Sequence, residues 1–119
     1  MLNLDYKCME WAQNINEISD SDLENNLRKA LGVLQEDGVY AMFLWLENKD
    51  KKISIKLLNM LNDQEIKKYF LNDSSFPENF KEFCEKLKEV AKDIDKLLFM
   101  KRLLERTLVY ALYHARIRG

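Results

Sequence analysis

The stretch EDGVYAMFLWLENK, residues 36–49, decides the fold that this sequence predicts. Gly38 precedes eight successive nonpolar residues, 39–46, which are apolar on every side when wound into a helix. An ordinary surface helix has one apolar stripe, so this run has to be enclosed by the rest of the domain or by partner proteins. We therefore expect it to be the central helix of the fold.

Two helical segments are expected before this run. Apolar residues recur at helical spacing over residues 4–18, which predicts a first helix. Ser21 and Glu24 have the spacing of an S-x-x-E capping box, which predicts the start of a second helix. Gly32 inside it costs up to about 1 kcal/mol relative to alanine, so we expect a loosened turn or a close helix contact there. The Asp-Gly pair at 37–38 is expected to end this helix.

The segment after the run is predicted to be helix rather than strand. Apolar residues alternate over residues 53–58, as in a strand, but Leu57, Leu58 and Leu61 continue at helical spacing. The surrounding sequence offers no partner strand. We therefore predict a helix that follows a charged turn at residues 48–52.

Capping and loop signals divide the remaining sequence. Asn62 and Glu65 have capping-box spacing, and residues 72–76 have the composition of a loop. Pro77 is expected in the first turn of the next helix, a position that proline favours. Helical periodicity over residues 80–94 predicts that helix, with a break near its end before the last one.

Composition agrees with an all-α fold. The chain has 119 residues with only three glycines and one proline, which favours helices throughout. A chain of this length can bury roughly two thirds of its unfolded surface. We predict a single helical domain, residues 1–119, folded as a compact bundle of about five to seven helices.

Charge is distributed unevenly along the chain. The formal net charge of −1 argues against a protein that coats nucleic acid by bulk attraction. Residues 96–119 nevertheless carry six basic and one acidic residue, a net charge of +5, whereas residues 1–95 carry 13 basic and 19 acidic residues, a net charge of −6. The cationic end has a simpler interpretation for Arg116 and Arg118, because cations collect near helix C-termini.

Residues with catalytic or metal-binding patterns are scarce. Cys8 and Cys84 lie far apart and are expected to be small core residues of a reducing compartment. His114, the one histidine, has neither an orienting carboxylate nor a nucleophile one helical turn away. No phosphate-binding loop, nucleophile elbow or metal-binding motif occurs. The N-terminus has neither a signal peptide nor a membrane-spanning run. We expect a cytoplasmic protein that is not an enzyme and binds no cofactor or metal.

The closing segment, residues 96–118, carries the candidate site. At 100 degrees per residue, one face of this helix is apolar and is expected to meet the core. A neighbouring stripe consists of Arg102, Arg106, Val109, Tyr113 and Arg116. A third line, again apolar, consists of Phe99, Leu103, Tyr110 and Ile117.

The stripe has two interpretations. Guanidinium groups match phosphate oxygens and an aromatic ring can stack on a base, so the stripe is a candidate contact for a nucleic-acid backbone. Its alternative is a solvated face with intrachain ion pairs, such as Glu105 with Arg102. The apolar third line is a candidate protein interface, because a helix with two apolar faces needs two packing partners.

Three stretches together resemble a known family. They are residues 11–35, which include Trp11-Ala12 and EISDSDLENNLRKALGVLQ, then EDGVYAMFLWLENK at 36–49, and FMKRLLERTLVYAL at 99–112. This order resembles the small all-helical subunit of the Cmr-type (type III-B) CRISPR effector complex. The chain lacks the proline that members commonly carry before the glycine, and residues 53–81 have no clear counterpart. A small subunit of the related Csm-type complex, or of another type III variant, is therefore the alternative, and these subunits share an architecture.

The resemblance implies a non-catalytic scaffold. Copies of such subunits stack head to tail into a minor filament, beside other subunits of the complex and along the guide RNA and target RNA. Lys101 and Arg102 match the basic pair of the family, whereas Arg106, Tyr113 and Arg116 are candidates from the helical wheel alone. A second, weaker basic cluster consists of Lys49, Lys51, Lys52 and Lys56. The alternative function is a helical protein–protein interaction module without a nucleic-acid role.

Overall fold

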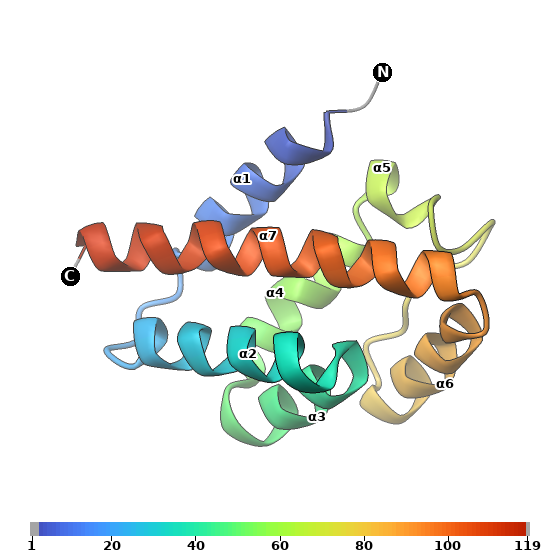
Figure 1. Cartoon of the computed structure of the whole chain (residues 1–119), viewed down its shortest axis with the longest axis horizontal. Helices are drawn as coiled ribbons and strands as arrows, with labels where there is room; N and C mark the ends of the chain where they lie inside the picture. The colour runs from blue at the N-terminus through green and yellow to red at the C-terminus, as the bar shows by residue number, and fades with distance from the viewer. Residues whose placement is uncertain (1–2, 119) are drawn as a thin grey trace.

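The computed structural model describes residues 3–118, and these residues form seven helices and no strand (Figure 1). The predicted all-α fold is therefore confirmed, as is helix rather than strand over residues 53–58. Buried apolar side chains from every helix contribute to one core. The helices are α1 (Leu4–Ile15), α2 (Leu23–Asp37), α3 (Val39–Lys49), α4 (Lys51–Leu61), α5 (Gln64–Lys67), α6 (Phe80–Ala91) and α7 (Ile94–Arg118).

Helix α7 is the element on which the others are arranged. Its 25 residues span about 37 Å at 1.5 Å per residue, close to the 39 Å length of the molecule. Figure 1 shows α7 crossing the whole width, with α2 alongside it and α1 crossing near its C-terminal half. The buried face of α7 includes Leu104, Leu108 and Ala111, as the helical wheel predicts. No helix within residues 3–118 combines the length and the apolar character needed to cross a bilayer.

Helix α1 is fixed to α7 by packing and by one side-chain amide. Cys8 and Ala12 are buried, and the Sγ atom of Cys8 lies 3.7 Å from the carbonyl oxygen of Leu103. The Nδ2 atom of Asn16 donates to the carbonyl oxygens of Ala12 and Ala111, at 3.1 and 3.0 Å. Cys8 is therefore a core residue, as expected, and burial raises the pKa of its thiol, whereas Cys84 is only half-buried.

The corner between α2 and α3 is made by Gly38. Its φ of +98° lies in the region that favours glycine, and α2 ends there as predicted. The expectation for Gly32 was wrong: α2 continues through it without a break, and no atom lies within 4 Å of the position that a Cβ would occupy.

The apolar run in α3 is enclosed by the domain on one side only. Met42, Phe43 and Leu46 are buried in the core, whereas Tyr40 and Leu44 are 49% and 45% exposed. The run is therefore a core helix with an apolar outer face rather than a helix that the domain surrounds.

Two predicted capping boxes were wrong. Helix α2 begins at Leu23 without a side-chain cap, and Asp20 instead accepts a hydrogen bond from the backbone N–H of Asp22 at 2.9 Å. Helix α5 is capped by Asp63, because the Asn62 side chain is engaged elsewhere. Asn62 exchanges two hydrogen bonds with the backbone of Phe76, at 2.7 and 2.8 Å, and so holds the predicted loop at residues 72–76.

The expected position of Pro77 was wrong, whereas the expected break between α6 and α7 is confirmed. Pro77 lies in the loop, and α6 begins at Phe80 with Asn79 as its cap. The predicted break before the last helix is present, because α6 ends at Ala91 and α7 starts at Ile94. Asp93 stabilises this start by accepting hydrogen bonds from the next turn.

Candidate nucleic-acid interface

The arginine and tyrosine stripe lies on the solvent face of α7. Arg102, Arg106, Tyr113 and Arg116 are all exposed, and Val109 between them is half-buried. Leu104, Leu108 and Ala111 on the other side of α7 are buried in the core, so the stripe faces solvent. The structure thus brings four of the predicted residues onto one surface.

Arg106 is tied to the first helix. Its Nη1 atom lies 2.9 Å from Oδ1 of Asp5, and the Tyr110 hydroxyl donates to the same oxygen at 2.6 Å. The hydrogen bonds from Tyr110 and Arg106 lower the pKa of Asp5, and the bond to Asp5 raises the pKa values of Tyr110 and Arg106. The ion pair is open to water, with side-chain exposures of 58% for Arg106 and 38% for Asp5, so it is well screened.

Arg116 combines an aromatic and an acidic contact. Its guanidinium carbon lies 5.6 Å from the ring centroid of Tyr113, which is cation–π range. Its Nε atom is 3.9 Å from Oε2 of Glu24, a distance at the limit of an ion pair. Glu24 is also 3.0 Å from Arg28, so it is shared between two cations.

Arg102 is the least constrained cation of the stripe. Within the described chain it has no acidic partner at ion-pair distance, so the suggested pair with Glu105 is not formed. Lys101 is half-buried on the neighbouring side of the helix. Of Lys101 and Arg102, Arg102 is therefore the more accessible.

A groove runs between α1 and α7 beneath these arginines. It has a volume of about 560 Å³, with a mainly apolar lining that includes Leu4, Phe99 and Val109. Arg102 and Arg106 lie at its polar rim, together with Asp5 and Glu105.

No known protein family, curated protein or solved structure matches this chain.

The second basic cluster lies on a different part of the molecule. Lys49 ends α3, and Lys51 and Lys52 begin α4, all three exposed. Lys51 pairs with Glu47 at 3.4 Å, and Lys56 is half-buried. Figure 1 shows α2 between α7 and α3, so these lysines are not joined to the arginine stripe.

The apolar line on α7 is divided between core and surface. Leu103 is buried, and Phe99 and Tyr110 are half-buried against the core. Phe99 contacts the rings of Tyr69 and Phe70, at centroid distances of 5.4 and 5.7 Å. Only Ile117 of the four is fully open, at 84% exposure, so the domain itself fills most of this predicted interface.

Exposed apolar residues at the start of α7 were missed in the sequence interpretation. Ile94 is 63% and Leu98 is 47% exposed, four residues apart and thus on one face. Leu97, between them in the sequence, lines an apolar hollow together with Val39 and Tyr40. In the sequence the helical spacing of Ile94 and Leu98 is the same as that of core residues. Their exposure became evident only from the way α6 and α7 pack in the structure.

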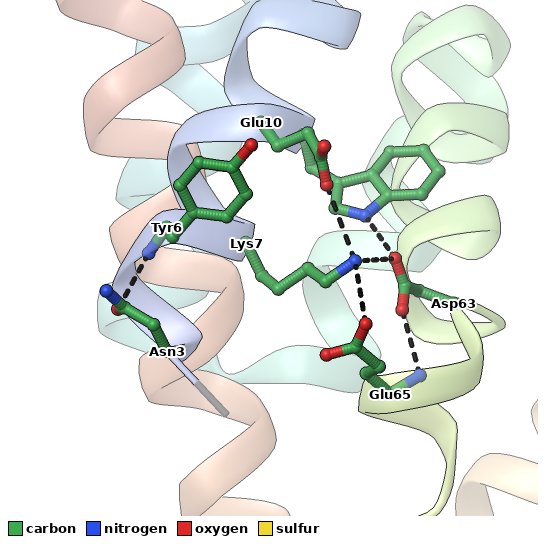
Figure 2. A network of polar contacts seen from close by, with 7 residues as sticks. Asn3, Tyr6, Lys7, Glu10, Asp63 and Glu65 are labelled. Atoms are coloured by element: carbon green, nitrogen blue, oxygen red, sulfur yellow. Dashed lines mark hydrogen bonds and ion pairs between the residues drawn. The ribbon is translucent and has the colours of Figure 1, made fainter. Parts of the chain in front are cut away.

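A polar network between α1 and α5 was also missed (Figure 2). Lys7 lies 3.1 Å from Asp63 and within 3.7 Å of Glu10 and Glu65. The indole N–H of Trp11 donates to the same Oδ2 of Asp63 at 3.1 Å, while Oδ1 caps α5. Lys7 and Trp11 are more than 50 residues from Asp63 in the sequence, so no local sequence pattern predicts these contacts.

Side chains that could hold a metal ion do not gather in the described part of the chain. No group of three or more His, Cys, Asp or Glu side chains with metal-binding geometry occurs within residues 3–118. His114 is exposed at the rim of a shallow hollow formed with Met9, Tyr113 and Ile117.

Proposed function

We propose that the protein is a cytoplasmic, non-catalytic small subunit of a type III CRISPR RNA-guided effector complex. In this role it contacts the backbone of guide or target RNA without reading the sequence. The observation that carries the proposal is the exposed face of α7, on which Arg102, Arg106, Tyr113 and Arg116 lie together. The resemblance of the sequence to the small subunits of these complexes is the second support for the proposal.

The chemistry of this face suits a phosphate backbone. A guanidinium group offers several donors in a planar fork that matches phosphate oxygens, and it stays charged at all physiological pH values. Tyr113 adds an exposed ring, and stacking on such a ring tolerates any base. The acidic partners of Arg106 and Arg116 are partly exposed, at 38% and 39%, so water already screens these pairs and a phosphate can replace the carboxylates.

Exposed apolar side chains at both ends of α7 support the head-to-tail assembly. Ile94 and Leu98 lie near its start, and Ile117 lies near its end. The two groups are separated by much of the long dimension of the molecule (Figure 1). Different surfaces that meet in successive copies form a heterologous contact, which generates an open filament.

The test is an affinity pull-down from the native host, with identification of the retained proteins and RNA. We expect other effector subunits and guide RNA to be retained. Arg102→Ala with Arg106→Ala should reduce RNA retention and flatten the log–log salt dependence by about 1.4, because each lost phosphate contact on a single strand contributes about 0.7. A matched control is Lys81→Ala with Lys92→Ala, which removes two exposed charges on or beside α6. Equal retention in both variants at several salt concentrations contradicts the proposal.

A protein–protein interaction module without a nucleic-acid role is the second candidate. The intrachain pairs of Arg106 with Asp5 and of Arg116 with Glu24 favour it, because they reduce the positive potential of the stripe. This function predicts a discrete dimer or heterodimer whose formation is insensitive to ribonuclease. Light scattering of the purified complex before and after ribonuclease treatment separates the two candidates.

A further inference from the structure

We propose that the groove between α1 and α7 receives an unstacked base of single-stranded RNA, and that Asp5 is a built-in competitor for the phosphate-binding Arg106. This inference rests on the proposed function and adds to it a pocket for a base and a carboxylate, Asp5, that competes with phosphate for Arg106. Neither follows from backbone contacts along the stripe alone.

The groove has the two components that a nucleotide needs. The groove has a volume of about 560 Å³. Leu4, Val109 and the half-buried aromatic ring of Phe99 supply its apolar lining. Arg102 and Arg106 lie at its rim, one helical turn apart, with Arg102 free of an acidic partner in the described chain. A base inserted against the apolar lining therefore leaves its phosphate near two guanidinium groups, which combines stacking with backbone contact.

Asp5 sets how much of this positive charge is available. It accepts from Arg106 at 2.9 Å and from Tyr110 at 2.6 Å, and Glu105 is the other acid at the groove. The four charges at the rim therefore balance, and Arg106 is free for a phosphate only when its contact with Asp5 is broken. Water screens this exposed pair, whereas an arginine–phosphate pair gains from bidentate geometry. The Tyr110 hydroxyl can keep Asp5 in place while Arg106 turns away.

Once Arg106 is released from Asp5, both guanidinium groups of the groove can bind an anion, which favours RNA over an apolar peptide as the occupant. The two guanidinium groups at the rim belong to the cationic end of the chain, where residues 96–119 carry six basic residues and one acidic residue. A peptide bound by apolar contact would gain nothing from replacing Asp5 on Arg106.

Three variants of the full chain test the inference. Asp5→Asn removes the competing charge but keeps an acceptor for Tyr110, and Asp73→Asn is the matched control, an exposed acid in the loop before α6. Val109→Trp fills the groove from the solvent side of α7, and Arg102→Ala removes one rim cation without adding bulk. Circular dichroism establishes that each variant is folded.

The measurement is fluorescence anisotropy with two labelled probes of equal length, a short oligouridylate and the same ribose-phosphate backbone without bases. We expect the wild-type protein to prefer the oligouridylate, and Val109→Trp to abolish that preference. Asp5→Asn should bind more tightly than both wild type and Asp73→Asn, with a log–log salt slope steeper by about 0.7 from one added phosphate contact. Arg102→Ala should weaken binding of both probes.

The outcomes distinguish the two proposals. Equal binding of the two probes by wild type, with Asp5→Asn no tighter than Asp73→Asn, overturns the base pocket and leaves backbone contact by the stripe in place. If wild type and Asp5→Asn bind neither probe at low salt, and no RNA is retained in the pull-down, the proposed function falls and the groove inference with it.

Discussion

Lys7 on α1 and Asp63 at the start of α5 lie 3.1 Å apart, and both side chains are largely shielded from solvent, at 16% and 11% exposure. Asp63 makes three interactions: it pairs with Lys7, accepts a hydrogen bond from the indole N–H of Trp11 and caps α5 (Figure 2). One carboxylate thus joins the first helix to the middle of the chain.

Replacing Asp63 with alanine should destabilise the protein by about 2 kcal/mol. The loss combines a helix cap with the hydrogen bond of a part-buried indole. Urea unfolding followed by circular dichroism measures it. Glu65→Gln is the control, since Glu65 is half-exposed and 3.7 Å from Lys7, and it should change the free energy of unfolding by less than about 0.5 kcal/mol. Equal effects of the two substitutions would refute the central role of Asp63.

Stability should fall on the acid side of about pH 4. Burial opposes ionisation of Asp63, but hydrogen bonds from Trp11, the Glu65 backbone and Lys7 outweigh it and lower its pKa. A group with a lowered folded-state pKa stabilises the native state above its unfolded pKa, and this contribution is lost as pH falls through the folded pKa.

Urea midpoints measured between about pH 5 and pH 2 check this dependence. Asp63→Asn should have a shallower pH profile than wild type over that range, since it removes one of the groups that titrate. Asp5, whose pKa is lowered by Tyr110 and Arg106, contributes in the same direction and is tested in the same way with Asp5→Asn. Parallel profiles for wild type and both variants would show that neither carboxylate is linked to folding.

Gly32 inside α2 and Gly38 at its end should respond to alanine in opposite ways. Gly32→Ala should stabilise the protein by about 0.5–1 kcal/mol, because α2 is regular there and space for a Cβ is open. Gly38→Ala should destabilise it by about 1–3 kcal/mol, because φ is +98°. Thermal unfolding of both variants measures the difference. A destabilised Gly32→Ala protein would mean that this side of α2 is not free.

Adjacent residues in α3 should differ sharply when truncated. Phe43 is 1% exposed and packs edge-on against Phe83 at 4.8 Å, so Phe43→Ala should cost about 3–5 kcal/mol. Leu44 is 45% exposed, and Leu44→Ala should change the free energy of unfolding of the isolated protein by less than about 0.5 kcal/mol. Chemical denaturation of both variants is the measurement, and a comparable loss from Leu44→Ala in isolation would contradict the one-sided burial of α3.

Local sequence signals were sufficient for the secondary structure of most of the chain. Helical spacing of apolar residues predicted the helix over residues 53–58 and the exposed stripe of α7, because periodicity reports which side of a helix is apolar. Glycine at 38 predicted the α2–α3 corner, since few other residues adopt its conformation. Capping predictions failed at Ser21, where α2 has no side-chain cap, and at Asn62, whose side chain bonds the distant backbone of Phe76.

The sequence by itself determined an all-helical chain with a cationic last helix, because both properties depend on residues that are near one another along the polypeptide. Only the tertiary structure decided which of these residues meet. Asp5 reaches Arg106 across 101 positions, Lys7 reaches Asp63 across 56, and Leu103 turns inward while Ile117 stays exposed. Such contacts depend on how the helices cross, and the crossing is set by side-chain packing over the whole core rather than by any local pattern.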